Sequence, residues 1–193
     1  DTPINKATND YIICFRKSYL FASYIVLNVS SPNTKNLRKL QEGENLEELL
    51  KTIKAEQKVL QKKHDKYVPF LLKISPDNTN SQLSIICSLL IKYKVDGIIA
   101  TNTTLSRSEV EKSPRRNESG GLSGAPLRAS SLKTLKFLKL SLKGRIPIIG
   151  VGGVMSGKDG KEKVDNGAEL IQIYSGLIFK GHKLIYELCR EIG

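Results

Sequence analysis

The sequence predicts an α/β protein built on a parallel β-sheet, and three observations support this fold class. Short apolar runs recur five times along the 193 residues, and amphipathic helical stretches separate them. The 39% apolar content is enough for a folded core. Polar or glycine-rich clusters follow the apolar runs, and ligands bind at the carboxyl ends of strands in parallel folds. We expect residues 1–193 to form a single domain.

The first β/α unit contains the most polar turn in the chain. Residues 8–22 have helical spacing of their apolar side chains, and an apolar run at 24–30 predicts the first strand. Pro32 has no N–H for a sheet ladder, so the strand ends just before it. Residues 45–64 predict an amphipathic helix, with Asn45 and Glu48 spaced as a capping box.

The second and third units follow the same pattern. Residues 68–76 form an apolar run with a single lysine, which predicts a buried strand. Thr79 and Gln82 predict a capping box at the start of the next helix. A third strand is expected at 97–102, and the polar stretch 103–123 predicts a long loop of the kind that is usually functional.

The last two units are shorter. Leucines at helical spacing predict a helix over 127–143, followed by a strand at 146–152. A short helix at 157–166, a last strand at 169–174 and a final helix at 182–191 complete the chain.

The arrangement of the sheet is either doubly wound or a barrel. No Gly-x-Gly-x-x-Gly follows the first strand, which disfavours a dinucleotide-binding doubly wound domain. Glycine turns at 150–154 and 174–176 resemble the phosphate site after strands seven and eight of a TIM (β/α)8 barrel. On this interpretation the chain holds about the last five β/α units, and we expect the earlier strands to precede Asp1.

Composition limits the possible partners. The 31 Lys and Arg exceed the 19 Asp and Glu, giving a net charge of +12. The lysines are scattered among glutamates without interleaved aromatic residues, which favours a solvated surface over a specific nucleic-acid site. Attraction to acidic lipid headgroups is the alternative. Three dispersed cysteines predict neither a disulfide framework nor a metal site, and no apolar run reaches the roughly 18 residues of a membrane span.

Several motifs in chain order resemble one enzyme family. They are Asn28–Thr34 (NVSSPNT), Leu72–Asp77 (LKISPD), Asp96–Thr104 (DGIIATNTT), Gly120–Leu127 (GGLSGAPL), Ile146–Val154 (IPIIGVGGV) and Gln172–Ser175 (QIYS). Across nearly all 193 residues the chain resembles the C-terminal part of a class 2, quinone-linked dihydroorotate dehydrogenase of the bacterial type.

The resemblance implies a flavin barrel that oxidises dihydroorotate to orotate in pyrimidine biosynthesis, with FMN as cofactor and quinone as electron acceptor. It implies a monomer bound peripherally at the cytoplasmic side of the bacterial inner membrane. The family's membrane and quinone-site helices, its first strands and some of its flavin and substrate contacts have no counterpart within residues 1–193. We therefore expect these residues alone to be inactive.

The resemblance also assigns roles to individual residues, and no metal ligand is among them. Ser31 matches the catalytic base. The matches to orotate contacts are Asn28, Asn33, Asn102 and Thr103. The matches to FMN contacts are Asn28, Lys73, Thr101, Gly124, Gly153, Tyr174 and Ser175, of which the last four belong to the phosphate end.

The residue types suit these roles, although each has a simpler interpretation. An unaided hydroxyl is a weak base, so Ser31 needs a path for its own proton, and it could otherwise be a turn-capping residue. Lys73 is the one charge in a buried apolar run, so it should face an anion or acceptor, and it could otherwise extend from a strand end to water. Asparagine amides offer both a donor and an acceptor, although a single Asn often only stabilises a turn.

Two other functions remain open on the sequence. A flavin-free, phosphate-binding barrel lyase or isomerase would share the late glycine turns but would leave the polar cluster at 28–34 unexplained. A basic nucleic-acid binder would show salt-sensitive association with duplexes.

Overall fold

The computed structural model describes residues 2–193 and contains a five-stranded parallel sheet whose spatial order follows the chain. The strands are β1 (Ile25–Asn28), β2 (Phe70–Ile74), β3 (Gly97–Ala100), β4 (Ile148–Val151) and β5 (Leu170–Gln172). All five lie within the predicted ranges, so the predicted alternation of strands and helices is confirmed. In register, Asn28 lies beside Lys73 and Ala100 lies beside Gly150.

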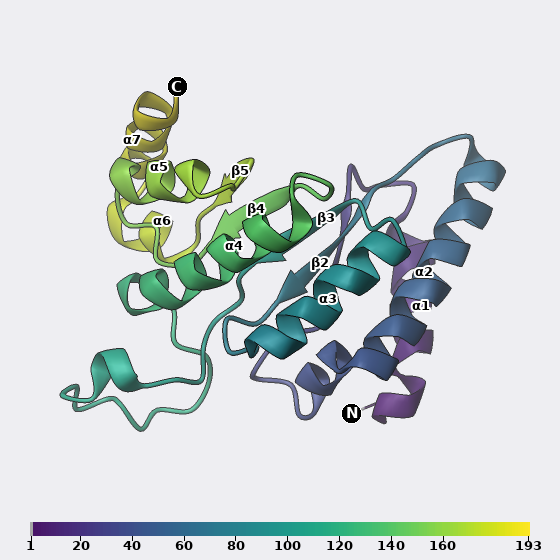
Figure 1. Cartoon of the computed structure of the whole chain (residues 1–193), viewed down its shortest axis with the longest axis horizontal. Coiled ribbons are helices and arrows are strands. Elements are labelled where there is room, and N and C mark those ends of the chain that lie inside the picture. The colour runs from purple at the N-terminus through teal and green to yellow at the C-terminus, as the bar shows by residue number, and fades with distance from the viewer. Residues whose placement is uncertain (1) are drawn as a thin grey trace.

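Within residues 2–193, seven α-helices precede, connect or follow the strands. They are α1 (Ala7–Ser18), α2 (Gly43–His64), α3 (Asn80–Lys92), α4 (Arg128–Leu142), α5 (Gly157–Asp165), α6 (Ser175–Lys180) and α7 (Lys183–Ile192). Short 3-10 turns occur at Ile4–Lys6, Leu37–Gln41, Ser108–Val110 and Ala125–Leu127. Figure 1 shows α3 and α4 lying side by side across the sheet.

The two faces of the sheet have different surroundings. Because side chains alternate along a strand, Leu27, Leu72 and Ile98 point to one face, where they join the main core formed with helices α1 to α4. On the opposite face Leu71 and Ile99 belong to a small separate cluster. A doubly wound sheet has helices on both faces and a reversal of strand order. Sequential order with helices on one face is instead the wall of a (β/α)8 barrel.

The start of α3 is as predicted. The Thr79 hydroxyl accepts the Gln82 N–H at 3.3 Å, and the Gln82 side chain accepts the Thr79 N–H at 2.8 Å. Both bonds of the capping box are therefore present.

The capping box predicted at Asn45 and Glu48 is wrong. Helix α2 begins earlier, at Gly43, and Glu42 precedes it without a side-chain cap. The 3-10 turn ending at Gln41 leads almost directly into the helix, so Asn45 lies inside the first turn. Its amide instead donates to the Lys39 carbonyl at 3.1 Å.

The long loop 103–123 is confirmed and projects from the rest of the molecule in Figure 1. Thr104 and Leu122 close its base through an antiparallel bridge. Arg107 donates to the carbonyls of Glu118 at 3.0 Å and Gly120 at 2.7 Å. The loop is therefore held by its own backbone contacts.

Two kinds of feature are absent from residues 2–193. None of their helices combines the length and apolar character that crossing a bilayer requires. No group of three or more His, Cys, Asp and Glu side chains among them is placed to hold a metal ion.

Candidate active site

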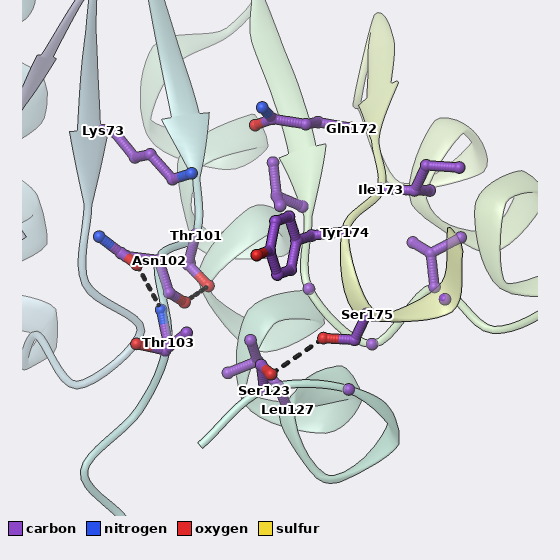
Figure 2. Close-up of a pocket in the computed structure, with 16 residues that line it drawn as sticks. Lys73, Thr101, Asn102, Thr103, Ser123, Leu127, Gln172, Ile173, Tyr174 and Ser175 are labelled. Carbon is purple, nitrogen blue, oxygen red and sulfur yellow. Dashed lines mark hydrogen bonds between the residues drawn. The ribbon is translucent and has the colours of Figure 1, made fainter. Parts of the chain in front are cut away.

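A cavity of about 270 Å³ opens at the carboxyl ends of the strands, where parallel α/β folds bind ligands. Residues at or just after the carboxyl ends of β2, β3, β4 and β5 line it, together with the end of the long loop (Figure 2). The lining residues are Lys73, Thr101–Thr103, Ser123, Gly124, Leu127, Val151–Val154 and Gln172–Gly176.

An amide and hydroxyl cluster joins the end of β1 to the end of β3. The Asn102 amide donates to Asn28 Oδ1 at 3.0 Å and to Ser30 Oγ at 3.1 Å. Ser30 is fully buried, and its hydroxyl donates to the Lys73 carbonyl at 2.7 Å. Ser30 was not among the predicted site residues, although its position two residues after Asn28 puts both side chains on one side of an extended chain.

Ser31 and Asn33 lie on the turn after this cluster and are not among the cavity-lining residues. Ser31 Oγ accepts the Asn33 N–H at 3.3 Å, which is the only hydrogen bond of this hydroxyl within residues 2–193. The turn-capping geometry is therefore present, and the Ser31 proton has no acceptor in the described chain.

The end of the long loop packs against this turn. A Cβ atom on Gly121 would lie 1.9 Å from Thr103 Oγ1 and 2.8 Å from Pro32 Cγ. A Cβ atom on Gly120 would lie 3.3 Å from Asn33 Oδ1. Only glycine at position 121 lets the loop approach the turn this closely.

Arg38 joins three strand-end loops, although it was not among the predicted site residues. Its guanidinium donates to the Ser30 carbonyl at 3.2 Å, to Asp77 Oδ2 at 2.7 Å and to the Thr103 carbonyl at 3.0 Å. The Asp77 carboxylate also accepts the Thr104 hydroxyl. Arg38 lies in the 3-10 turn before α2, where no periodic pattern marks it.

Lys73 extends from β2 into the cavity (Figure 2). Burial lowers the pKa of its ammonium below the ordinary value. Within residues 2–193 the ammonium forms neither a hydrogen bond nor an ion pair. A half-buried donor without an acceptor suits an anionic or electron-rich ligand.

The far end of the cavity is formed by glycine turns. Gly124 and Gly153 have φ angles of +77° and +73°, a backbone conformation that residues with a side chain rarely adopt. A Cβ atom on Gly153 would lie 2.4 Å from Arg128 Cα. The Ser175 hydroxyl donates to Ser123 Oγ at 2.9 Å, which joins the end of β5 to the long loop.

Most of the predicted site residues come together. Those lining the cavity are Lys73, Thr101, Asn102, Thr103, Gly124, Gly153, Tyr174 and Ser175. Asn28 is next to it through Asn102, and Ser31 and Asn33 occupy the adjoining turn. Thr101 is buried, and its hydroxyl donates to the Asn102 carbonyl at 2.9 Å. Tyr174 is 77% exposed, so the described residues leave its ring largely uncovered.

Comparisons with known proteins agree on one family. The family model described as dihydroorotate dehydrogenase matches residues 2–193. A protein of Methylobacillus flagellatus named "Dihydroorotate dehydrogenase (quinone)" is 51% identical over 193 residues, all of this chain and 57% of its own length. A protein of the same name from Wigglesworthia glossinidia brevipalpis is 53% identical over 191 residues, which are 99% of this chain and 57% of that protein.

Solved structures agree with these sequence matches. The ligand-free DHODH from Eimeria tenella superimposes with a TM-score of 0.92 at 31% identity, over all of this chain and 56% of the other. The DHODH in complex with ferulenol from the same organism gives 0.91 at 30%, over all of this chain and 54% of the other. The chain thus spans about half the length of the proteins it matches. The chain belongs to the dihydroorotate dehydrogenase family.

Proposed function

We propose that the full-length protein, meaning a polypeptide of the relatives' length that contains residues 1–193, oxidises dihydroorotate to orotate with FMN as cofactor and a quinone as electron acceptor. The observation that carries the proposal is the cavity itself. It has an unpartnered Lys73 ammonium and a glycine turn at Gly153 in its lining, beside the Asn28 and Asn102 amides. Relatives named "Dihydroorotate dehydrogenase (quinone)" at 51% and 53% identity support it.

The cavity residues fit FMN on two independent grounds. Lys73 offers a half-buried positive charge without an acceptor, which suits the electron-rich edge of a flavin ring. Gly153 lines the cavity, and within residues 2–193 its N–H has no acceptor, so it can donate to a phosphate. We assign Gly124, Tyr174 and Ser175 to the same phosphate end. When bound, FMN supplies the two-electron acceptor of the reaction.

Asn28, Thr101 and the substrate residues complete the proposed site. We assign Asn28 and Thr101 to flavin contacts. The substrate contacts are Asn28, Asn33, Asn102 and Thr103. Carboxamides both donate and accept, as a planar ligand edged with carbonyl, N–H and carboxylate groups requires. The Asn102 amide, which donates to Asn28 Oδ1 at 3.0 Å, could donate to such a ligand instead.

We assign Ser31 as the base that removes a proton from substrate C5 while hydride leaves C6. A neutral hydroxyl is a weak base, so its own proton must leave in the same step. Within residues 2–193 that proton has no acceptor, and the hydroxyl only accepts the Asn33 N–H. The long loop packs against Pro32 of this turn at Gly121, next to the proposed reaction site.

The remaining features of the proposal concern the whole protein. We place residues 1–193 within one flavin-binding (β/α)8 domain, in a monomer attached peripherally to the cytoplasmic side of the bacterial inner membrane. Elements outside these residues would receive the quinone. The bacterial sources and the quinone in the names of the relatives support this assignment.

An absorbance spectrum of the full-length protein tests the proposal. We expect a yellow flavin spectrum that bleaches when dihydroorotate is added without oxygen and returns when a soluble quinone is added. A colourless protein would contradict the proposal and would favour a flavin-free phosphate-binding barrel enzyme. If the protein is yellow but dihydroorotate does not bleach it, the proposed cofactor stands and the proposed substrate is wrong.

A further inference from the structure

The proposed chemistry does not use Lys163, a lysine that lies almost completely inside the protein. It is on α5, and only 1% of its surface is exposed. Its ammonium donates to Ser131 Oγ of α4 at 2.5 Å. Burial is the main cause that lowers the Lys163 pKa to about 8, so the amine is mostly charged at pH 7. A buried charge is costly unless something offsets it.

No carboxylate is in direct contact with this ammonium. Within residues 2–193, Lys163 Nζ has no Asp or Glu oxygen within 4.0 Å, the limit for an ion pair. The two nearby acidic groups are already paired, because Arg128 contacts Asp159 at 2.6 Å and Glu162 at 2.8 Å. The ammonium therefore has a hydroxyl as its hydrogen-bond partner and no neutralising anion of its own.

Ser131 transmits the interaction to the glycine turn. An ammonium can only donate, so the Ser131 hydroxyl accepts from Lys163 and uses its own hydrogen as a donor. Of its two acceptors, the Gly152 carbonyl at 3.0 Å is nearer than the Arg128 carbonyl of its own helix at 3.4 Å, so Gly152 is the main acceptor. Three groups thus form one chain of hydrogen bonds, in which each bond polarises the next.

The direction of this carbonyl fixes the direction of the next N–H. In a trans peptide the C=O of one residue and the N–H of the next point to opposite sides. With the Gly152 carbonyl held by Ser131 on one side, the Gly153 N–H points away from it, and both glycines line the cavity. Within residues 2–193 this N–H donates to no acceptor. It is therefore free for a ligand anion.

We propose that Lys163 is a positioning residue for the phosphate end of FMN. Through Ser131 it holds the Gly152–Gly153 peptide with its N–H toward the phosphate, and it places a buried positive charge beneath the turn. Lys163 touches neither the phosphate nor the reacting atoms. The inference rests on the proposed function, since it takes FMN as the ligand of the cavity.

The test compares FMN with riboflavin, which has the same ring system without the phosphate. Dissociation constants of both flavins are measured by fluorescence quenching on the full-length apoprotein. We expect Lys163→Met to weaken FMN binding about tenfold or more, the usual effect of losing a charge-assisted hydrogen bond. Riboflavin affinity should stay within about twofold, because the ring end of the cavity is not connected to Lys163. The ³¹P resonance of bound FMN should also shift in the variant.

Two further variants make the result specific. Ser131→Ala breaks the chain without removing the charge, so it should cause a smaller FMN-selective loss, and it replaces Lys163→Met if that variant does not fold. Lys161→Met is the matched control, because Lys161 is on the same helix with its side chain 53% exposed and is paired with Asp165 at 3.3 Å. It should bind both flavins like the wild type.

The outcomes separate this inference from the proposed function. Suppose that the wild type binds FMN and that the variants lose affinity for FMN and riboflavin equally, or for neither. This result would overturn the role of Lys163 and leave the proposed function intact. A wild type that binds neither flavin would overturn the proposed function, and this inference with it.

Discussion

Ser31 presents its hydroxyl at the turn after β1, where it accepts only the Asn33 N–H within residues 2–193. If it is the base, Ser31→Ala in the full-length protein should lower the rate of flavin reduction by about 10² to 10⁴, the usual contribution of a general base. Stopped-flow absorbance with dihydroorotate measures this rate. Ser88→Ala is the control, because Ser88 is exposed on α3 and bonds only to its own helix. A Ser31→Ala rate within threefold of wild type would exclude the base role.

Lys73 offers a second test at a single residue. Its ammonium has a pKa lowered by burial and has no acceptor within residues 2–193. Positive charge at the ring edge favours the reduced, anionic flavin, so Lys73→Met should make the flavin reduction potential more negative or empty the site. A redox titration against a reference dye measures the potential.

The control for Lys73 is Lys92→Met, because Lys92 is on the surface and paired with Glu47. It should leave both the potential and the flavin content unchanged. Equal potentials and flavin contents in Lys73→Met and wild type would make Lys73 a structural residue only.

Among the structural elements, the three loops joined by Arg38 behave as one unit. They follow β1, β2 and β3 and contain Ser30, Asp77 and Thr103. Arg38→Ala removes three hydrogen-bond donors, one from the carbonyl of the fully buried Ser30 and one from the partly exposed Asp77 carboxylate. We expect a loss of about 1–3 kcal/mol in the free energy of unfolding, together with a lower kcat and a higher KM for dihydroorotate. Urea unfolding and steady-state kinetics measure these effects.

Arg16→Ala is the control for Arg38. The Arg16 guanidinium is 58% exposed and pairs with Glu56 at 2.8 Å, and exposed pairs contribute about 1 kcal/mol or less. Its kinetics should match wild type. If Arg38→Ala has wild-type kinetics despite lower stability, the three loops do not depend on Arg38 for their catalytic geometry.

The elements also show what the sequence could predict. The strands were predictable because short apolar runs alternate with helical periodicity, and the same periodicity located α2, α3 and α4. The cap at Thr79 was predictable from the Thr-x-x-Gln spacing, whereas the same kind of spacing failed at Asn45 because a 3-10 turn already leads into α2. The short helix α6 was not predicted, since its six residues are too few for a periodic pattern.

The site shows the same division between local and long-range information. Motif residues such as Lys73 and Gly153 were predictable because each marks a strand end within a recognisable stretch. Ser30, Arg38 and Lys163 were not, because their importance comes from contacts with residues 43, 65 and 32 positions away. No local pattern encodes such contacts.

At the scale of the molecule, buried lysines make stability depend on pH. The unfolded chain keeps a proton on Lys163 up to its ordinary pKa of 10.5, whereas the folded apoprotein keeps it only up to about 8. Because the unfolded state binds more protons in this window, raising the pH from about 8 to 10.5 stabilises the fold through this group. Burial lowers the pKa of Lys54 and Lys73 as well, so they act in the same direction.

The Lys163→Met variant isolates this contribution. The stability of the variant minus that of wild type should be largest near pH 7, where wild-type Lys163 carries a buried charge. This difference should fall steadily toward pH 10, as wild-type Lys163 loses its charge. Urea unfolding of the two full-length apoproteins at several pH values measures the difference. Tyr11 and Tyr67, whose pKa values burial raises to about 12, affect both proteins equally and cancel. A difference independent of pH would contradict the buried charge.

The sequential strand order β1-β2-β3-β4-β5 has a consequence for folding and synthesis. Within residues 2–193 each strand pairs with its neighbours in the chain, so this part of the sheet can grow one unit at a time. A ribosome would therefore deliver the turn with Ser31 first and the glycine turns last. The ring-binding end would already be assembled when the phosphate-binding end emerges, and cofactor capture would depend on the last β/α units of the chain.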